Sequence, residues 1–299
     1  MKVEVLAPAK VNLALHVTGQ RGDGYHLLDT LVGFGPAFDR LTIQVSESLV
    51  LAVEGPEASG VPTDASNLIL KAARVLNANR GGSFKLQKFL PVASGIGGGS
   101  SDAAAAIRGL LALWSSELPK EISSEVLLPY LDDILKLGAD VPMCLFPRAL
   151  RARGIGEQID LVDGMPDLPV VLMNPRIPVS TPEVFRHLGV KENAPMPERL
   201  PAWPDKGAFC EWLACQRNDL QAPAIGLYPE IGKTLDILEG CEGVLLARMS
   251  GSGATCFAIF RDDECSRLAA EKLKRDHPRH WIAGGWLGDK IREAMPKIS

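Results

Sequence analysis

The sequence predicts a mixed α/β fold arranged in one or two domains. Residues 2–18 hold two strand-like runs, and in the second run apolar residues alternate with other types, as in a strand. Residues 83–114 predict a strand, a glycine-rich loop and a helix in succession. The chain has 299 residues, which is enough to bury a substantial core.

Composition argues against several classes of protein. Hydrophobic residues make up 46% of the chain and charged residues 23%, and the net charge is −4 at pH 7. The acidic balance and the lack of a basic stripe argue against nucleic acid as a partner. The six cysteines form no C-x-x-C pair and no metal-ligand spacing with histidine, which favours reduced thiols. The chain shows no signal-peptide pattern and no apolar run of about 18 residues, so we expect a cytoplasmic location and no membrane partner.

The first strands place two polar side chains together. The runs in residues 2–18 are separated at Ala7 to Ala9. Side chains alternate along a strand, so Lys10 and Asn12 would project from the same face. A lysine at the start of a strand is often only a solvated edge residue, and this pattern alone leaves that interpretation open. On the opposite face, the core-facing set would be Val11, Leu13, Leu15 and Val17.

A polar turn at residues 19–26 ends in Tyr25 and His26. These two rings suggest that something packs on the turn, although a hairpin loop with a surface aromatic is equally compatible. Residues 27–55 are strand-rich. A helix is expected over residues 66–76, with a serine or asparagine N-cap.

The stretch 90–102 is the most distinctive part of the chain. It places four glycines within residues 95–99 and continues with Ser100, Ser101 and Asp102. Glycine allows positive φ and close approach of a ligand to the backbone. Either serine suits the N-cap of the following helix, whose start carries unpaired N–H groups and attracts phosphate. The P-loop and dinucleotide motifs do not fit, and a flexible turn before an ordinary helix is the alternative.

Strand 83–89 precedes this loop, and helix 102–114 follows it. A further helix over residues 125–137 would stop at Gly138. Asp140 comes directly before Val141 and Pro142 and could simply cap the next helix. A strand pair then leads to Met173, and we place a domain boundary near its start.

The last third of the chain alternates helices and strands around two irregular stretches. Residues 191–206 contain four prolines and predict a loop. The small-residue turn at 250–255 could let the backbone approach a ligand, or could be a plain hairpin turn. Helices are expected over 229–239 and 263–275, and strands over 244–249, 256–260 and 281–286.

Taken together, these motifs resemble the GHMP kinase superfamily, whose members phosphorylate small alcohols with ATP. The resemblance covers residues 6 to about 260, with its motifs in family order. One departure is Val92-Ala93-Ser94, where the family usually has more glycine, and residues 191–206 have no clear counterpart. The four signatures are 7–13 with 22–26, 90–104, 137–142 and 250–254, and the weaker ones are 66–68, 179–185 and 218–220.

The resemblance implies two domains with an active site in the cleft between them. Residues 1–160 would form an ATP-binding domain of the ribosomal protein S5 domain 2-like fold, and residues 161–299 a GHMP kinase C-terminal domain. The chain looks most like the branch that phosphorylates the 2-hydroxyl of cytidine diphosphate methylerythritol in non-mevalonate isoprenoid synthesis. ATP and Mg²⁺ would be used, and the protein would be a monomer or weak homodimer.

The resemblance also assigns roles to individual residues. Asp140 would accept or orient the hydroxyl proton, and Lys10 would stabilise charge on the transferred phosphoryl group. Tyr25 and Phe185 would stack on cytosine while His26 binds its edge. No acidic pair is visible, so no residue is expected to hold the metal. The ATP-binding residues would be Asn67, Pro91, Val92, Ala93, Ser94, Gly95, Ile96, Gly97, Gly98, Gly99, Ser100 and Ser101. The substrate-binding residues would be Asn12, Tyr25, His26, Phe185, Gly251 and Ser252.

Three other interpretations remain. Another GHMP kinase, acting on mevalonate, phosphomevalonate or homoserine, would share the glycine loop but would not be expected to carry the Asp-Gly-Tyr-His run at 23–26. A non-catalytic nucleotide sensor is disfavoured because Lys10 and Asp140 are both present. An RNA-binding protein is suggested only by the S5-like half, and the acidic balance opposes it.

Overall fold

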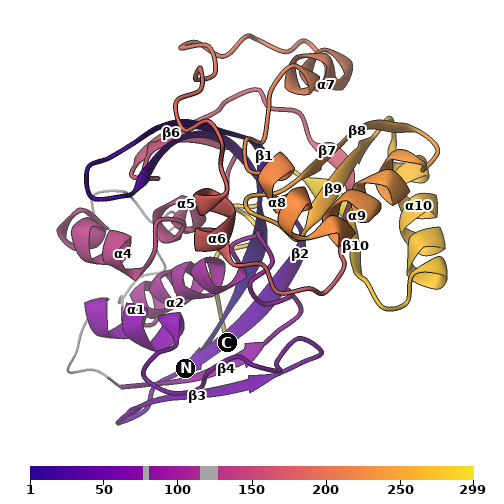
Figure 1. The fold of residues 1–299 in the computed structure, drawn as a ribbon. Coiled ribbons are helices and arrows are strands. Elements are labelled where there is room, and N and C mark those ends of the chain that lie inside the picture. Colours follow the sequence, from indigo (N-terminus) through magenta and orange to yellow (C-terminus); the bar gives the residue numbers. More distant parts are fainter. Residues whose placement is uncertain (77–80, 115–126) are drawn as a thin grey trace.

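Two β-sheets form the framework of the computed structural model, which describes residues 1–76, 81–114 and 127–299. β1 (Lys2–Gln20) and β2 (His26–Gln44) pair antiparallel along almost their whole length and cross the centre of the molecule (Figure 1). The first sheet has the strand order β11-β1-β2-β4-β3, and β5 and β6 extend it from β2. The second sheet has the order β10-β7-β9-β8.

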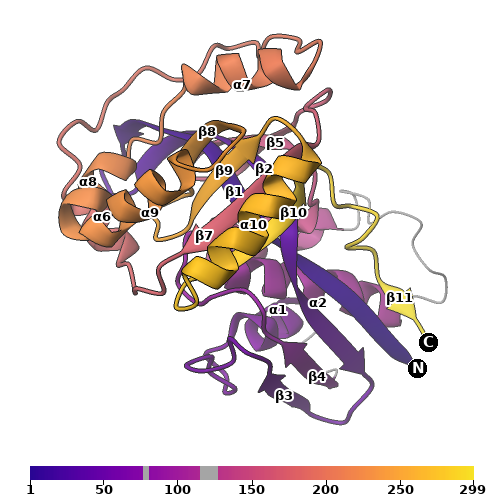
Figure 2. The same ribbon diagram turned by 90° about the vertical axis from the view of Figure 1, so that its right-hand side faces the viewer.

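The first sheet carries a layer of helices. α1 and α2 share one apolar cluster with β1, β2 and β4, and the buried alanines 103–106 let α2 lie close to the sheet. β11 pairs with β1, so the two termini lie side by side (Figures 1 and 2). The remaining elements here are β3 (Leu49–Glu54), β4 (Gly82–Gln87), β5 (Leu150–Gly154), β6 (Gln158–Leu161), β11 (Lys297–Ile298), α1 (Leu68–Leu76), α2 (Gly98–Trp114), a 3-10 turn (Leu128–Tyr130), α4 (Leu131–Leu137) and α5 (Val141–Leu145).

The second sheet is covered by α10, which runs along β7 and β10 (Figure 2), and by α9, which packs against β8 and β9. No helix in the described ranges is both long and apolar enough to span a bilayer. The elements of this half are β7 (Leu168–Asn174), β8 (Val244–Met249), β9 (Cys256–Phe260), β10 (Trp281–Leu287), α6 (Thr181–Arg186), α7 (Lys206–Ala214), α8 (Gln221–Leu227), α9 (Pro229–Glu239) and α10 (Asp263–Asp276).

β1 differs from its expected form. It is one continuous strand and not two runs, because register shifts at Pro8/Lys10 and Asn12/Ala14 absorb the irregularity. Both of its faces are buried at this point, including the face that carries Lys10. The interpretation of Lys10 as a solvated edge residue is therefore wrong.

α2 starts four residues earlier than expected, at Gly98 instead of residue 102. The Ser101 N–H donates to the Gly97 carbonyl at 2.8 Å, so the first helical turn already includes the glycines and serines. Neither serine is therefore the N-cap. The early start also moves Asp102 into the second turn, where it is buried.

Most other expected elements are confirmed to within a few residues, including β4, β8, β9, β10, α9 and α10. The helix expected over 125–137 is a 3-10 turn followed by α4, and residues 125 and 126 lie outside the described ranges. A short strand that was not expected, β11, follows β10. The domain boundary near residue 160 stays a prediction.

The proline-rich segment 191–206 is irregular, as expected, and one buried ion pair holds it in place. Arg151 of β5 binds Asp29 of β2 through two hydrogen bonds of 2.7 Å. Asp29 also accepts the Met196 N–H at 2.7 Å, and Arg151 donates to the carbonyls of residues 196–198. The segment is therefore docked along β2 and β5.

The packing of α2 on the sheet gives a stability prediction. A Cβ at Gly109 would lie 2.4 Å from Ile43 and 2.9 Å from Val5, so Gly109→Ala should lower the free energy of unfolding by about 1–3 kcal/mol. The control is Gly226→Ala in α8, where a Cβ has no neighbour within 4 Å. That change should be neutral or stabilising by up to about 1 kcal/mol in urea titration. Equal effects of the two changes would contradict this packing.

Candidate active site

An ion pair between Lys10, in the middle of β1, and Asp140, directly before α5, is the chemical centre of the site. Lys10 Nζ lies 2.8 Å from Asp140 Oδ2 and donates to Asn12 Oδ1 at 3.0 Å. The Lys10 side chain is 5% exposed and that of Asp140 is 39% exposed. The ammonium is thus sheltered, while its carboxylate partner is open to solvent and to a substrate.

Two local features aim these side chains. Asp140 stands at the N-terminus of α5, but its carboxylate makes no capping hydrogen bond, so the simple capping role is wrong. Asn12 is fixed through its amide, which donates to Thr30 Oγ1 at 2.8 Å. Thr30 in turn donates to the Ala14 carbonyl at 2.6 Å, so the Asn12 oxygen is left to accept from Lys10.

The glycine loop is held by its carbonyl groups. Ser94 O accepts from the Thr255 N–H at 3.0 Å, and Ile96 O from the Lys10 N–H at 2.9 Å. Between them, Gly95 O accepts from the Ser250 hydroxyl at 3.0 Å. In a trans peptide the N–H points opposite to the preceding carbonyl, so the next N–H groups are directed away from these partners.

Two glycines of the loop are required by their surroundings. Gly95 has φ 78°, and a Cβ there would lie 2.6 Å from two carbonyl oxygens of the 250–253 turn. Gly97 has φ 62°, and a Cβ there would lie 3.2 Å from the Lys10 side chain. The loop therefore lies directly on Lys10, and the first N–H groups of α2 lie just beyond it.

The other expected ATP-binding residues contribute unequally. Ser94 donates to Pro91 O and Ser101 to Pro8 O, so both hydroxyls are used within the protein. Asn67 accepts the Ile69 N–H at 2.9 Å and caps α1, as expected. Val92, Ala93 and Gly99 are exposed, and Gly98 and Ser100 are partly exposed. Whether these residues contact phosphate stays a prediction.

The 250–255 turn joins the two halves of the site. A Cβ at Gly251 would lie 2.9 Å from Gly95 O and 3.2 Å from Asn12 Oδ1, so this turn touches both the loop and β1. Ser252 shares a hydrogen bond of 2.7 Å with Thr181. Sequence reasoning missed Ser250, whose hydroxyl also accepts the Asn12 N–H at 3.0 Å.

The polar turn after β1 meets α6. The rings of His26 and Phe185 stack at 4.6 Å with 24° between their planes, and Tyr25 is 61% exposed. Burial and the nearby Lys191 lower the pKa of His26. His26 Nε2 is buried and has no hydrogen-bond partner among the described residues. This nitrogen is therefore available to form a hydrogen bond with a ligand.

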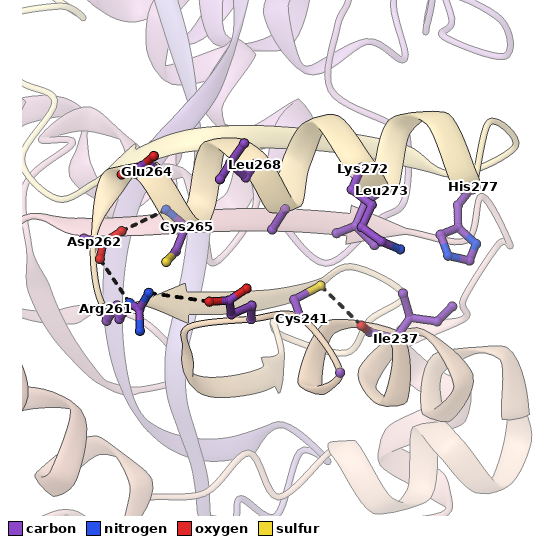
Figure 3. Close-up of a pocket in the computed structure, with 13 residues that line it drawn as sticks. Ile237, Cys241, Arg261, Asp262, Glu264, Cys265, Leu268, Lys272, Leu273 and His277 are labelled. Atoms are coloured by element: carbon purple, nitrogen blue, oxygen red, sulfur yellow. Dashed lines mark hydrogen bonds and ion pairs between the residues drawn. The ribbon is translucent and has the colours of Figure 1, made fainter.

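A separate groove of about 580 Å³ lies between α9 and α10. Figure 3 shows the lining residues Cys265 and Leu268 on α10, Ile237 and Cys241 below that helix, and Arg261 hydrogen-bonded to Asp262 at one end. Its lining residues include neither Lys10, Asp140 nor any part of the glycine loop. The groove between α9 and α10 is therefore distinct from the site around the Lys10–Asp140 ion pair.

Comparison with known proteins identifies the class. The model of the GHMP kinase N-terminal domain matches residues 67–148, and that of the GHMP kinase C-terminal domain matches residues 202–279. With the two-sheet fold, the glycine loop and the Lys10–Asp140 pair, these matches define an ATP-dependent small-molecule kinase of the GHMP class.

Similar chains narrow this further. A kinase of Cereibacter sphaeroides is 50% identical over 94% of this chain and 97% of its own length, and one of Ruegeria pomeroyi is 49% identical over 95% and 99%. A solved structure named 4-(cytidine 5'-diphospho)-2C-methyl-D-erythritol kinase aligns at a TM-score of 0.71, with 34% identity over 95% of this chain and 99% of that chain. The chain belongs to the 4-diphosphocytidyl-2-C-methyl-D-erythritol kinase family, the name carried by both bacterial relatives.

The position of Asp140 predicts a specific loss of activity. If Asp140 accepts the hydroxyl proton, Asp140→Asn should lower kcat by roughly 10²–10⁴-fold, while ATP affinity should change little because the glycine loop is intact. Asp133→Asn is the control, because this exposed carboxylate on α4 pairs only with Lys136 among the described residues. Steady-state kinetics with both variants would make the test, and near wild-type turnover of Asp140→Asn would exclude a role in chemistry.

Proposed function

We propose that this protein transfers the γ-phosphoryl group of ATP to the 2-hydroxyl of 4-diphosphocytidyl-2-C-methyl-D-erythritol. The observation that carries the proposal is the Lys10–Asp140 pair directly against Gly97 of the glycine loop. The names of relatives that match almost the whole chain support the choice of alcohol.

The reaction exchanges one phosphorus–oxygen bond for another. The hydroxyl oxygen attacks the γ-phosphorus, and the bond from that phosphorus to the departing ADP oxygen breaks. The hydroxyl proton passes to Asp140, whose carboxylate is accessible. The sheltered Lys10 ammonium stabilises negative charge on the transferred group, and it gains strength because water is largely excluded around it.

Phosphate binding falls to the loop and the start of α2. The N–H groups after Ser94, Gly95 and Ile96 face away from the partners that hold their carbonyls. They join the unpaired N–H groups of the first turn of α2, where the helix dipole favours an anion. We assign the ATP phosphates to this surface.

Magnesium accompanies ATP in most phosphoryl transfers, and we propose it here. Among residues 1–76, 81–114 and 127–299, no three His, Cys, Asp or Glu side chains gather to hold a cation. The phosphate oxygens and water would then provide most of its ligands, in keeping with how Mg²⁺ is usually bound.

Recognition of cytidine is assigned to the polar turn and α6. The exposed Tyr25 ring and Phe185 provide two stacking surfaces, and His26 Nε2 provides a free polar atom. The His26 imidazole covers one face of the Phe185 ring in this structure. Cytosine would therefore displace the imidazole when it stacks on Phe185. The displaced imidazole is then beside the edge of the base.

Location and assembly complete the proposal. All six cysteines carry free thiols, which suits a reducing compartment, so we propose the cytoplasm. We propose a monomer or weak homodimer that uses a small-molecule alcohol and no nucleic acid, in line with the net charge of −4.

A coupled ATPase assay with a panel of alcohols tests the proposed function. The panel contains the complete cytidine diphosphate substrate, methylerythritol without its cytidine diphosphate, mevalonate and homoserine. Only the complete substrate should give efficient turnover. Equal efficiency with the bare methylerythritol fragment would show that the protein has no cytidine-binding site. Preference for mevalonate or homoserine would refute the assignment of the substrate.

The cytidine site makes a prediction for Tyr25. Removing the ring in Tyr25→Ala should raise KM for the cytidine substrate by roughly 5- to 150-fold, because stacking a base is worth about 1–3 kcal/mol. KM for ATP should not change, since the glycine loop is untouched. Tyr25→Phe keeps the ring and serves as the control. An unchanged KM in Tyr25→Ala would show that cytosine does not stack here.

A further inference from the structure

Three charged side chains are buried together behind the glycine loop. Lys88, just after β4, donates to Asp39 of β2 and to Asp102 of α2, the latter at 2.6 Å. All three residues are at most 4% exposed. Removing charges from water costs free energy that the pairing only partly returns, so a cluster of this kind in a core raises the question of its use.

The cluster contacts both ends of the loop. At the entry, the second oxygen of Asp39 accepts the N–H groups of Phe89 and Leu90 at 2.6 and 2.9 Å. At the exit, a Cβ at Gly98 would lie 3.1 Å from Lys88 Nζ, so the ammonium is directly beneath the first residue of α2. The second link at the exit is Asp102, one turn further along α2.

We propose that Lys88 is a positioning residue for phosphate transfer, which acts with Asp39 and Asp102 to hold the entry and exit of the glycine loop at the spacing that receives the ATP phosphates. This inference rests on the proposed function and deepens it. Lys88 does not touch the substrate; it acts through the backbone of the loop and through α2.

Asp102 is the member of the cluster that can be changed most cleanly. Only its Oδ2 is used, since Oδ1 is buried without a hydrogen-bond partner among the described residues. Burial raises the pKa of this carboxyl to about 7, and the Asp39 carboxylate adds to the rise while Lys88 opposes it. Burial thus favours a neutral side chain at 102, and such a change leaves the Lys88–Asp39 pair intact.

Two variants of similar size separate positioning from charge. Asp102→Asn keeps an oxygen that can accept from Lys88, whereas Asp102→Leu cannot accept and breaks the link between Lys88 and α2. The control is Arg108→Lys on the same helix, because Arg108 is fully buried and its hydrogen bonds within the described residues go to backbone carbonyls away from the loop. Melting temperature is measured first for each variant.

The measurement is titration with a non-hydrolysable ATP analogue, followed by steady-state kinetics. Asp102→Asn should bind the analogue as well as wild type, and Asp102→Leu should lose about 10- to 100-fold in kcat/KM for ATP, because misplacement by about 1 Å has that cost. KM for the alcohol at saturating ATP should stay constant. Arg108→Lys should lower the melting temperature without changing affinity for the analogue.

Equal ATP binding and kcat/KM in the folded Asn and Leu variants would overturn the proposal and leave the cluster a structural feature only. Asp102→Ala replaces the leucine variant if that chain does not fold, and the same comparison applies. The titration does not involve the alcohol. Wild-type protein that binds the analogue but fails to phosphorylate the cytidine substrate would therefore refute the proposed function. The inference about Lys88 would still be decided by the comparison of the Asp102 variants.

Discussion

The backbone of the glycine loop is the constraint on which the rest of the structure depends. Its carbonyls at Ser94, Gly95 and Ile96 are bound by three partners from two parts of the chain, so the adjoining N–H groups are directed outward. One of these partners is the backbone of Lys10, whose side chain lies against Gly97. The fixation of the loop and the placement of the Lys10 ammonium are therefore one arrangement.

Two buried arginines tie distant elements together away from the loop. Arg108 of α2 donates to the carbonyls of Leu6, Cys144 and Ala294, and so ties β1, the end of α5 and the C-terminal segment together. Burial lowers the pKa of this arginine to about 10, and that of Arg248 to about 10 as well. Carbonyls at helix ends lack partners within their own helix, and α5 and α7 obtain them from these two side chains.

Local sequence patterns predicted most elements and placed Lys10 and Asn12 on one strand face, and the resemblance to the GHMP kinases added Asp140 to the same hypothesis. The local patterns failed where distant residues decide the outcome. Alternation put Lys10 on the correct strand face but could not show that both faces are covered, and the capping pattern at Asp140 could not show that Lys10 takes its carboxylate. Nothing in the spacing pairs Lys88 with Asp39, 49 positions away, because that contact exists only after β2 and β4 have paired.

A crystal structure with a non-hydrolysable ATP analogue tests the central claim most directly. That claim is that the glycine loop and the Lys10–Asp140 pair form a single phosphoryl-transfer site. The account predicts β- and γ-phosphates on the N–H groups of the loop and of the first turn of α2, with the γ-phosphate within hydrogen-bonding distance of Lys10 Nζ. Phosphates bound elsewhere, for example in the groove between α9 and α10, with the Lys10–Asp140 pair unchanged, would contradict it.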